Sequence, residues 1–368
     1  RIDVRDERNH EDIRAYVKRR LRTGFRLVED SREAQRAHFL RLQVVRDMLD
    51  PVSRANVGRL SRTFFYAPQE QYRVICAKAA GVFMYAKEVL SRLDTNPHVD
   101  LQSLPSGLAE LYMSRYRETF AGSDALDQFK MHTKPMLAML TAARSALPES
   151  LVVNAKSSPD LAADPTFQTT RRQHLAFVKR MCVGSLAEEA GLLQFSHKSF
   201  ADWLLGEASG SFRLDQGDGE RLLAEVCLRL VRGEGEEESA AMRYALRHGV
   251  SHLVAAGRRS DARRLVAEDV GWILARARED PLGLVEDCRR LGEREPAEGG
   301  DPLVELIGRA VLMGLAAVRR DPRQVLGQVV GRLLGSRGED AVREFVERVE
   351  RYGEKEAGLQ WWCPVTAT

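Results

Sequence analysis

His197 and Lys198 are the residues of this sequence whose position most suggests chemistry. They lie in GLLQFSHKSFADWLL (191–205), between a short apolar run and an amphipathic helical pattern. A neighbouring serine, Ser196 or Ser199, is the expected N-cap of that helix. Unpaired N–H groups and the positive end of the helix dipole would then lie beside two side chains that can carry positive charge, which predicts an anion site.

The helix that follows is predicted to bury one apolar stripe. Phe200, Trp203 and Leu204 recur at spacings of three and four residues, which is typical of one helix face. His197 falls three residues before Phe200, so we expect it at the buried edge of the helix rather than in solvent. A second interpretation is that His197 only caps the helix or packs against the core.

The composition is that of an ordinary globular protein. The chain has 368 residues, of which 44% are hydrophobic, and 56 basic against 53 acidic side chains leave a net charge of +3. Roughly two to four small domains are expected at this length. Because the net charge is small, attraction to nucleic acid would have to come from a local patch.

The cysteine pattern and the short apolar runs indicate a cytoplasmic protein. Five cysteines are scattered and lack metal-ligand spacing, as is typical of a reducing compartment. Apolar stretches such as VLMGLAAV (311–318) are far shorter than the roughly 20 residues that span a bilayer. The sequence opens without Met and without a signal-peptide pattern, so we expect a fragment of a longer protein.

Helical periodicity covers nearly the whole sequence and predicts a mainly α fold. The first helix is expected in NHEDIRAYVKRRL (9–21), where Ile13, Tyr16, Val17 and Leu21 make one apolar stripe. Further helices are expected over 68–93, with an interruption at Gly81, and over about 108–119 and 126–143. The exception is GSLAEEAGLLQF (184–195), where two apolar pieces around a glycine-containing turn predict a β-hairpin. The segments around it give the order helix, helix, helix, hairpin, helix, which is typical of a winged-helix domain. Beyond RLDQGDGE (213–220), helices joined by short loops predict a superhelical arm of stacked helical hairpins.

The order of four segments resembles the region that follows the nucleotide-binding core in NACHT-type STAND regulatory NTPases. These segments are AAGVFMYAKEVLSRL (79–93), LQSLPSGLAELY (101–112), GLLQFSHKSFADWLL (191–205) and MRYALRHGVSHLVAAGR (242–258). In one group of these proteins a helical segment leads into a C-terminal WD-repeat β-propeller, and RRDPRQVLGQVVGRLLG (319–335) and the tryptophan-containing tail are similar to it. The resemblance covers almost the whole chain, and the order of the segments carries it.

The resemblance implies an architecture. It divides the chain into the end of the nucleotide-binding core (1–30), a helical domain (31–122), a winged-helix domain (123–212), a helical arm (213–350) and a tail or linker toward a C-terminal sensor (351–368). Proteins of this family are switches, closed with ADP and open as oligomeric scaffolds with ATP. The implied partners are the upstream nucleotide-binding domain, a downstream sensor such as a β-propeller, protein partners and further copies of the chain; neither nucleic acid nor a membrane span is expected.

ADP or ATP with Mg²⁺ is the implied cofactor of the longer protein, and none is expected for this chain by itself. No G-x-x-x-x-G-K-[ST] loop occurs in the sequence, so the residues that would hold the phosphates and Mg²⁺ are missing. We therefore expect neither catalytic residues nor a metal site in this chain, whereas the full-length protein could be an ATPase.

The family's F-x-H-x-S-F stretch gives His197 a specific role. In the winged helix of the family, that histidine reaches the β-phosphate of bound ADP and so holds the closed form together. The pattern is matched here at Phe195, His197, Ser199 and Phe200, whereas Lys198 has no family role. A hydrogen bond from an imidazole to a phosphate contributes roughly 1.5–3 kcal/mol when charge is involved, which is enough to bias a switch.

Gly81 and Phe83 correspond to a second family motif. Many relatives carry Gly-x-Pro in the helical domain, and the proline packs on the adenine. Here the positions are Gly81, Val82 and Phe83, so the proline is missing. Phe83 could stack on a purine through its aromatic face. The alternative is a core phenylalanine on an amphipathic helix.

Three other interpretations compete with the switch. A winged-helix DNA-binding regulator is suggested by basic residues on the helix before the hairpin and by the basic run YVKRRLRTGFR (16–26), although near-equal numbers of acids favour a solvated helix face. A nucleotide-independent scaffold would use the arm from about residue 219 to bind a protein partner. The basic residues on the helix before the hairpin are Arg171, Arg172, Lys179 and Arg180.

A stand-alone enzyme has the least support. Ser196, His197 and Asp202 lie within a few residues of each other, but catalytic triads assemble from distant segments, and capping explains this group better. His248 and His252 lie four residues apart on one helical pattern, a spacing that could bind a metal. Without a third ligand, a solvated or core-edge pair is the preferred interpretation.

Overall fold

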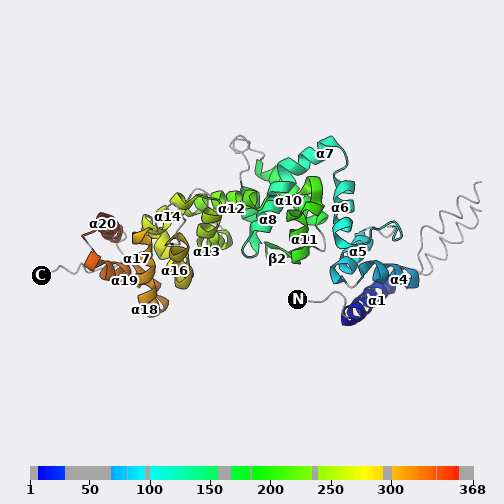
Figure 1. Cartoon of the computed structure of the whole chain (residues 1–368), viewed down its shortest axis with the longest axis horizontal. Coiled ribbons are helices and arrows are strands. Elements are labelled where there is room, and N and C mark those ends of the chain that lie inside the picture. Colours follow the sequence, from blue (N-terminus) through cyan, green and yellow to red (C-terminus); the bar gives the residue numbers. More distant parts are fainter. Residues whose placement is uncertain are drawn as a thin grey trace, which may run out of the picture. The chain divides into compact units, whose positions relative to one another are not determined.

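The computed structural model shows a mainly helical chain with one small β-sheet, as the periodicity predicts (Figure 1). It describes residues 7–29, 68–80, 82–95, 100–155, 167–182, 185–233, 239–292, 301–336 and 338–355. Side chains are described in the same ranges apart from residues 22–29, 68–70, 94–95 and 167–168.

The chain divides into two compact units, which are described separately. The first comprises Arg1–Phe129, Lys179–Ala187 and Phe195–Arg213, and the second comprises Lys130–Val178, Glu188–Gln194 and Leu214–Thr368. Much of the predicted helical domain, from 31 to 67, and the predicted tail from 356 onward lie outside the described residues. The domain boundaries implied by the resemblance stay a prediction.

In the described part of the first unit, α1 (Glu7–Glu29), α4 (Pro68–Ala79) and α5 (Phe83–Thr95) share one core, to which Leu111 also belongs. Ile13 and Val17 of α1 are buried there, together with Ile75 of α4 and Val89 of α5. The apolar stripe predicted for the first helix is therefore confirmed. The break between α4 and α5 is also confirmed, and Ala80 adopts a left-handed φ of 44° there. Gly81 itself lies outside the described residues.

A loop of residues 100–107 connects this core to α6 (Leu108–Thr119), whose bounds agree with the predicted helix. Leu101 and Leu104 of the loop are buried in the same core. The Tyr85 hydroxyl donates to the Pro105 carbonyl at 2.6 Å, so the loop is also held by a hydrogen bond to α5. The helix α7 (Ser123–Gln128) follows.

The continuous helix predicted over 126–143 is divided. A π-helical turn, η1 (Phe129–Thr133), separates α7 from α8 (Lys134–Ala142). Such a turn inserts one extra residue into a helix and preserves the approximate apolar spacing, so periodicity does not reveal it.

Where the structure describes the chain, three short strands form the sheet, in the order β1-β3-β2. The predicted hairpin is confirmed as β2 (Leu186–Glu189) and β3 (Leu192–Phe195). Ala190 and Gly191 between them both have positive φ, 49° and 73°, as a two-residue type I′ turn requires. β1 (Leu147–Pro148) pairs antiparallel with β3, with Leu147 opposite Leu193.

Among the described residues, two helices lie between β1 and the hairpin, and two helical segments follow the hairpin directly. They are α9 (Glu149–Asn154) and α10 (Phe167–Met181), then α11 (Lys198–Leu205) and the 3₁₀ segment η3 (Glu207–Phe212). From α8 onward the chain therefore runs helix, strand, helix, helix, hairpin, helix. β1 was not predicted, because two residues are too few to display a strand period.

A series of helices follows to the end of the described chain. They are α12 (Gln216–Val231), α13 (Ser239–Ala255), α14 (Arg259–Ala267), α15 (Val270–Glu279), α16 (Pro281–Gly292), α17 (Pro302–Met313), α18 (Leu315–Arg320), the 3₁₀ turn η4 (Pro322–Gln324), α19 (Val325–Leu333), the 3₁₀ turn η5 (Leu334–Ser336) and α20 (Asp340–Lys355). Several begin at an aspartate cap: Asp269, for example, accepts from the Trp272 N–H at 2.8 Å.

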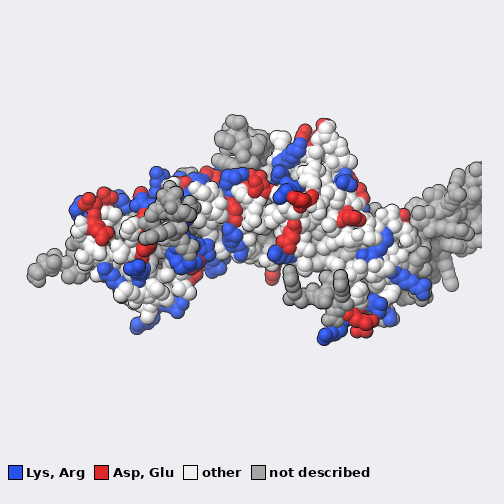
Figure 2. All heavy atoms as spheres, in the orientation of Figure 1, with Lys and Arg blue, Asp and Glu red and all other residues white. Residues whose placement is uncertain are grey.

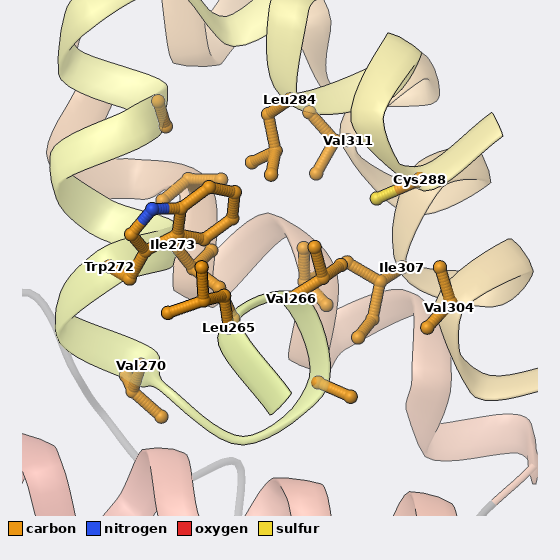
Figure 3. Packing of buried hydrophobic residues seen from close by; sticks show 14 of the residues in the cluster. Leu265, Val266, Val270, Trp272, Ile273, Leu284, Cys288, Val304, Ile307 and Val311 are labelled. Atoms are coloured by element: carbon orange, nitrogen blue, oxygen red, sulfur yellow. The ribbon is translucent and has the colours of Figure 1, made fainter. Parts of the chain in front are cut away.

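One extended core joins these helices. Figure 3 shows Leu265 of α14, Trp272 of α15, and Val304 and Ile307 of α17 among the buried side chains of this core. Trp272 is 3% exposed and Ile307 is fully buried. Consecutive helices pack on each other throughout, for example α12 on α13 and α16 on α17. These helices therefore form one packed body and not a string of separate elements.

Charged side chains of both signs are interspersed over much of the visible face (Figure 2). Many of them form ion pairs, such as Arg258 with Asp261 at 2.8 Å and Arg247 with Glu279 at 2.5 Å. In the part of the chain that the structure describes, no helix is both long enough and apolar enough to cross a membrane.

Candidate functional site

The segment around His197 is fixed by the aromatic face of α11. Phe200 and Trp203 are 2% and 5% exposed, and Leu204 is fully buried, so the predicted stripe is confirmed. Their partners come from α6. The Tyr112 ring lies 4.9 Å from Phe200, and the Tyr116 ring lies 5.0 Å from Trp203 in an edge arrangement. Such ring pairs add to the stabilisation from burial, so α11 is held firmly on α6.

His197 itself is the N-cap of α11. Its backbone is extended, with φ −152° and ψ 139°, and its Nδ1 accepts a hydrogen bond from the Ser199 N–H at 3.1 Å. The prediction that Ser196 or Ser199 supplies the cap is therefore wrong, and capping by His197 is confirmed. Nδ1 also lies 2.8 Å from the Ser199 hydroxyl, which keeps the imidazole over the first turn.

His197 is exposed, so the prediction that it lies at the buried edge is wrong. The reason is geometric. The spacing of three residues from Phe200 places a side chain on the same face only if both residues are helical, and the cap residue is not.

The capping bond decides which ring nitrogen of neutral His197 carries the proton. Because Nδ1 accepts from a backbone N–H, the proton of the neutral ring is on Nε2. Within the described residues no partner of Nε2 is found. The exposed edge of the ring is thus a hydrogen-bond donor at a helix start. Lys198 points its ammonium toward Asp202, 3.8 Å away, and both are mostly exposed.

A buried polar cluster, missed by the sequence prediction, lies behind this helix start. Glu88 of α5 is 2% exposed, pairs with Arg115 of α6, and accepts from the Ser185 hydroxyl at 3.3 Å. The carbonyl of Ser185 in turn accepts from the N–H of Ser196 at 2.9 Å. A chain of polar contacts therefore runs from α5 to the residue before His197.

Burial raises the pKa of the Glu88 carboxyl, and the nearby Arg115 charge opposes that effect. Burial also raises the pKa of Tyr112, while the nearby hydroxyl of Ser199 lowers it. The sequence does contain a signal for Glu88. It stands among Tyr85, Ala86 and Val89 on the apolar face of its helix, where an acid needs a partner.

Phe83 is not a core residue, since it is 42% exposed. Its ring lies 4.6 Å from that of Tyr16 on α1. The core interpretation is therefore wrong, and the purine-stacking role stays a prediction. No hydrogen bond or ring contact joins Phe83 to His197 among the described residues, and Gly81 lies outside them.

The two histidines of α13 belong to a different, buried network in the second unit. His252 is fully buried; its Nδ1 lies 2.6 Å from Glu220 and its Nε2 lies 3.0 Å from the Tyr244 hydroxyl. Arg144 donates from its guanidinium to Glu220 at 2.8 Å, and its backbone N–H donates to Tyr244 at 3.2 Å. Every side chain of this network has a partner, as buried polar groups require.

His248 lies at the edge of this network, with Nε2 3.0 Å from the Ser145 hydroxyl. Burial lowers the pKa of His248 to about 4, and the neighbouring His252 contributes to that effect. Across the described ranges, no group of three or more His, Cys, Asp or Glu side chains could hold a metal ion.

The basic residues of α10 do not all face solvent. Arg171 is only 1% exposed, and its guanidinium donates to the carbonyl of Val152 at 2.8 Å. Burial lowers its pKa to about 10. One of the four cations considered for a DNA-binding surface is therefore used inside the fold.

Comparison with known proteins does not identify a relative. No family model, no curated protein and no solved structure matches this chain.

Proposed function

We propose that this chain is the regulatory segment of a NACHT-type STAND signal-transduction ATPase, comprising the helical domain, a winged helix and a helical arm. The observation that supports it most is the strand order β1-β3-β2, with α8 before β1 and with α9 and α10 between β1 and the hairpin. That connectivity is the arrangement expected of a winged-helix domain. The chain itself is proposed to be regulatory and not catalytic.

The proposed switch uses His197 in the way the resemblance implies. The neutral imidazole is oriented by its cap to present Nε2–H outward, and that N–H would donate to the β-phosphate of ADP bound to the upstream domain. ATP with Mg²⁺ would favour the open, oligomeric form. Phe83, exposed at the start of α5, is the proposed purine contact beside Gly81.

The helices from α12 onward are proposed to form the superhelical arm that couples this switch to a downstream sensor, such as a β-propeller. We expect a cytoplasmic protein whose partners are its own upstream and downstream domains, other proteins and further copies of itself. The DNA-binding alternative is less supported, because Arg171 is buried.

The test is ADP retention by the longer protein that includes the preceding nucleotide-binding domain. His197→Ala removes both the cap and the phosphate donor, whereas His197→Asn retains a good helix cap and withdraws the imidazole. Both variants are expected to weaken ADP binding about tenfold or more, as loss of a hydrogen bond to a charged group predicts. Lys198→Ala is the matched control at the same helix start and should bind ADP normally.

Two results would refute the proposal. One is an unchanged ADP affinity in His197→Asn, which would leave the histidine with a capping role only. The other is the absence of a phosphate-binding loop from the sequence preceding residue 1. In that case a helical scaffold, independent of nucleotide, would take its place.

A further inference from the structure

A cavity of about 520 Å³ lies in the second unit, whereas the residues of the proposed switch belong to the first. It is lined by the end of α12, by α14, by the start of α15 and by α20. Its volume is in the range that holds small organic ligands. Three aliphatic side chains and one aromatic ring line it, namely Leu228, Leu265, Val270 and Tyr352.

Basic side chains outnumber acids around this cavity. Five cations and three carboxylates line it, which leaves an excess of two positive charges. The carboxylates already have partners. Asp261 accepts from Arg258 at 2.8 Å, Glu268 lies 3.7 Å from Arg263, and Asp269 caps α15. Asp261 also lies 3.6 Å from Arg232 and 3.9 Å from Arg264, which both line the cavity. Among the described residues, the lining cations that pair with no lining carboxylate are therefore Arg348, Arg351 and Lys355.

Two of these cations, Arg351 and Lys355, have no acidic partner in the part of the chain that the structure describes. Arg351 donates to the backbone carbonyl of Glu347, at 3.3 Å. The two cations lie four residues apart on α20 and therefore share one helix face. Arg348 extends the same row and is held by the Ala267 carbonyl of α14 at 3.0 Å.

We propose that this cavity binds a phosphate monoester carried on an aromatic or aliphatic group. Arg351 and Lys355 hold the phosphate, and Leu228, Leu265 and Tyr352 contact the group that bears it. A phosphate monoester carries about −1.5 to −2 charges at neutral pH, which matches the excess of two in the cavity. The guanidinium of Arg351 can donate two parallel hydrogen bonds to such an oxyanion.

Two sources share this chemistry: a free mononucleotide and a phosphorylated side chain of a peptide. Titration calorimetry on the full chain would therefore use adenosine 5′-monophosphate with adenosine as its counterpart, and a phosphotyrosine peptide with its unphosphorylated form. At least one phosphorylated probe should bind tenfold or more tightly than its counterpart. Which probe binds identifies the source.

Charge-removing variants locate the site. Arg351→Gln combined with Lys355→Gln should abolish the preference for the phosphorylated probe. Arg343→Gln is the matched control, since Arg343 is on the same helix, pairs with Asp340 and lies outside the lining. It should retain the preference.

A steric variant tests the cavity without changing its charge. A Cβ atom at Gly271 would lie 3.4 Å from Oδ1 of Asp269 and 3.7 Å from the Tyr352 ring, which are ordinary contacts, so Gly271→Leu adds volume at the cavity lining without an overlap at its Cβ. It should weaken the binding of the phosphorylated probe at least fivefold.

The proposal is overturned if phosphorylated and unphosphorylated probes bind alike, if the double variant retains the preference, or if Arg343→Gln loses as much as the double variant. The last result would indicate general attraction of anions to a basic surface. His197→Asn should leave this binding unchanged, which distinguishes the cavity from the proposed nucleotide switch.

Discussion

Replacement of Gly219 by alanine should destabilise the protein, although alanine is the better helix former. Gly219 is buried in the first part of α12, where that helix packs on α8. A Cβ atom there would lie 2.0 Å from the carbonyl oxygen of Ala138, 2.6 Å from its carbonyl carbon and 2.9 Å from the Cβ of Ala142. The nearest atoms belong to backbone, so no side-chain rotation can remove the overlap.

The size of the effect follows from two opposing terms. Glycine in a helix interior is up to about 1 kcal/mol less stable than alanine, so helix propensity alone would raise the free energy of unfolding of the variant by that amount. Accommodation requires α8 and α12 to separate by about 1 Å, which loses close packing along both helices. Overpacking of this kind costs roughly 1–3 kcal/mol, and more when the backbone cannot yield. A net loss of about 2 kcal/mol is expected.

Urea unfolding followed by circular dichroism measures this difference. With an m value of about 2 kcal/mol/M, the midpoint should fall by about 1 M. Gly331→Ala is the matched control, because Gly331 is also helical, in α19, and nothing lies within 4 Å of the position that an alanine Cβ would occupy there. That variant should be about 0.5–1 kcal/mol more stable than the natural chain. If Gly219→Ala is as stable as Gly331→Ala, the close approach of α8 and α12 is refuted.

The buried network of α12 and α13 gives two further predictions. His252→Ala should lower the free energy of unfolding by about 3 kcal/mol, because it leaves Glu220 and Tyr244 buried without their shared partner. The half-buried His248 has a smaller role, so His248→Ala should lower it by about 1 kcal/mol. Urea unfolding of the two variants measures the difference. Burial lowers the pKa of His248 from 6.5 to about 4, so its neutral form stabilises the fold fully above pH 6.5, and this stability is lost as pH falls toward 4. In His248→Gln the urea midpoint should therefore depend less on pH between 6.5 and 4 than it does in the natural chain. The same pH dependence in both proteins would contradict the prediction.

The fold was predictable wherever one period extends over a whole element. The bounds of α6 and the type and place of the β2–β3 hairpin follow from spacing and turn residues alone. The strand β1 and the π turn η1 did not, because neither lasts long enough to establish a period. The sheet order, which supports the winged-helix proposal most, depends on β1 and was therefore accessible only in three dimensions.

The candidate site was predicted less well, for a different reason. Helical spacing correctly predicted that Phe200 and Trp203 are buried. The same spacing gave a wrong prediction for His197, because this residue precedes the helix and does not have helical backbone angles. Glu88 and Ser185 were missed because they are 97 residues apart, and no local pattern relates a buried carboxylate to its hydroxyl partner at that separation.

The partner of α11 shows most directly what periodicity omits. Tyr112, Tyr116 and Phe120 recur every four residues along α6 and its C-cap, and Phe200 and Trp203 form a stripe on α11, so the spacing in each segment favours one buried aromatic face. Periodicity identifies a buried face but not the face that covers it. The structure pairs these two faces.

The pairing has a mechanical consequence. The helix α11 packs on α6, Glu88 of α5 binds both Arg115 of α6 and Ser185, and Ser185 accepts a hydrogen bond from Ser196. Because of these contacts, a displacement of α5 or α6 must also displace the helix start that carries His197.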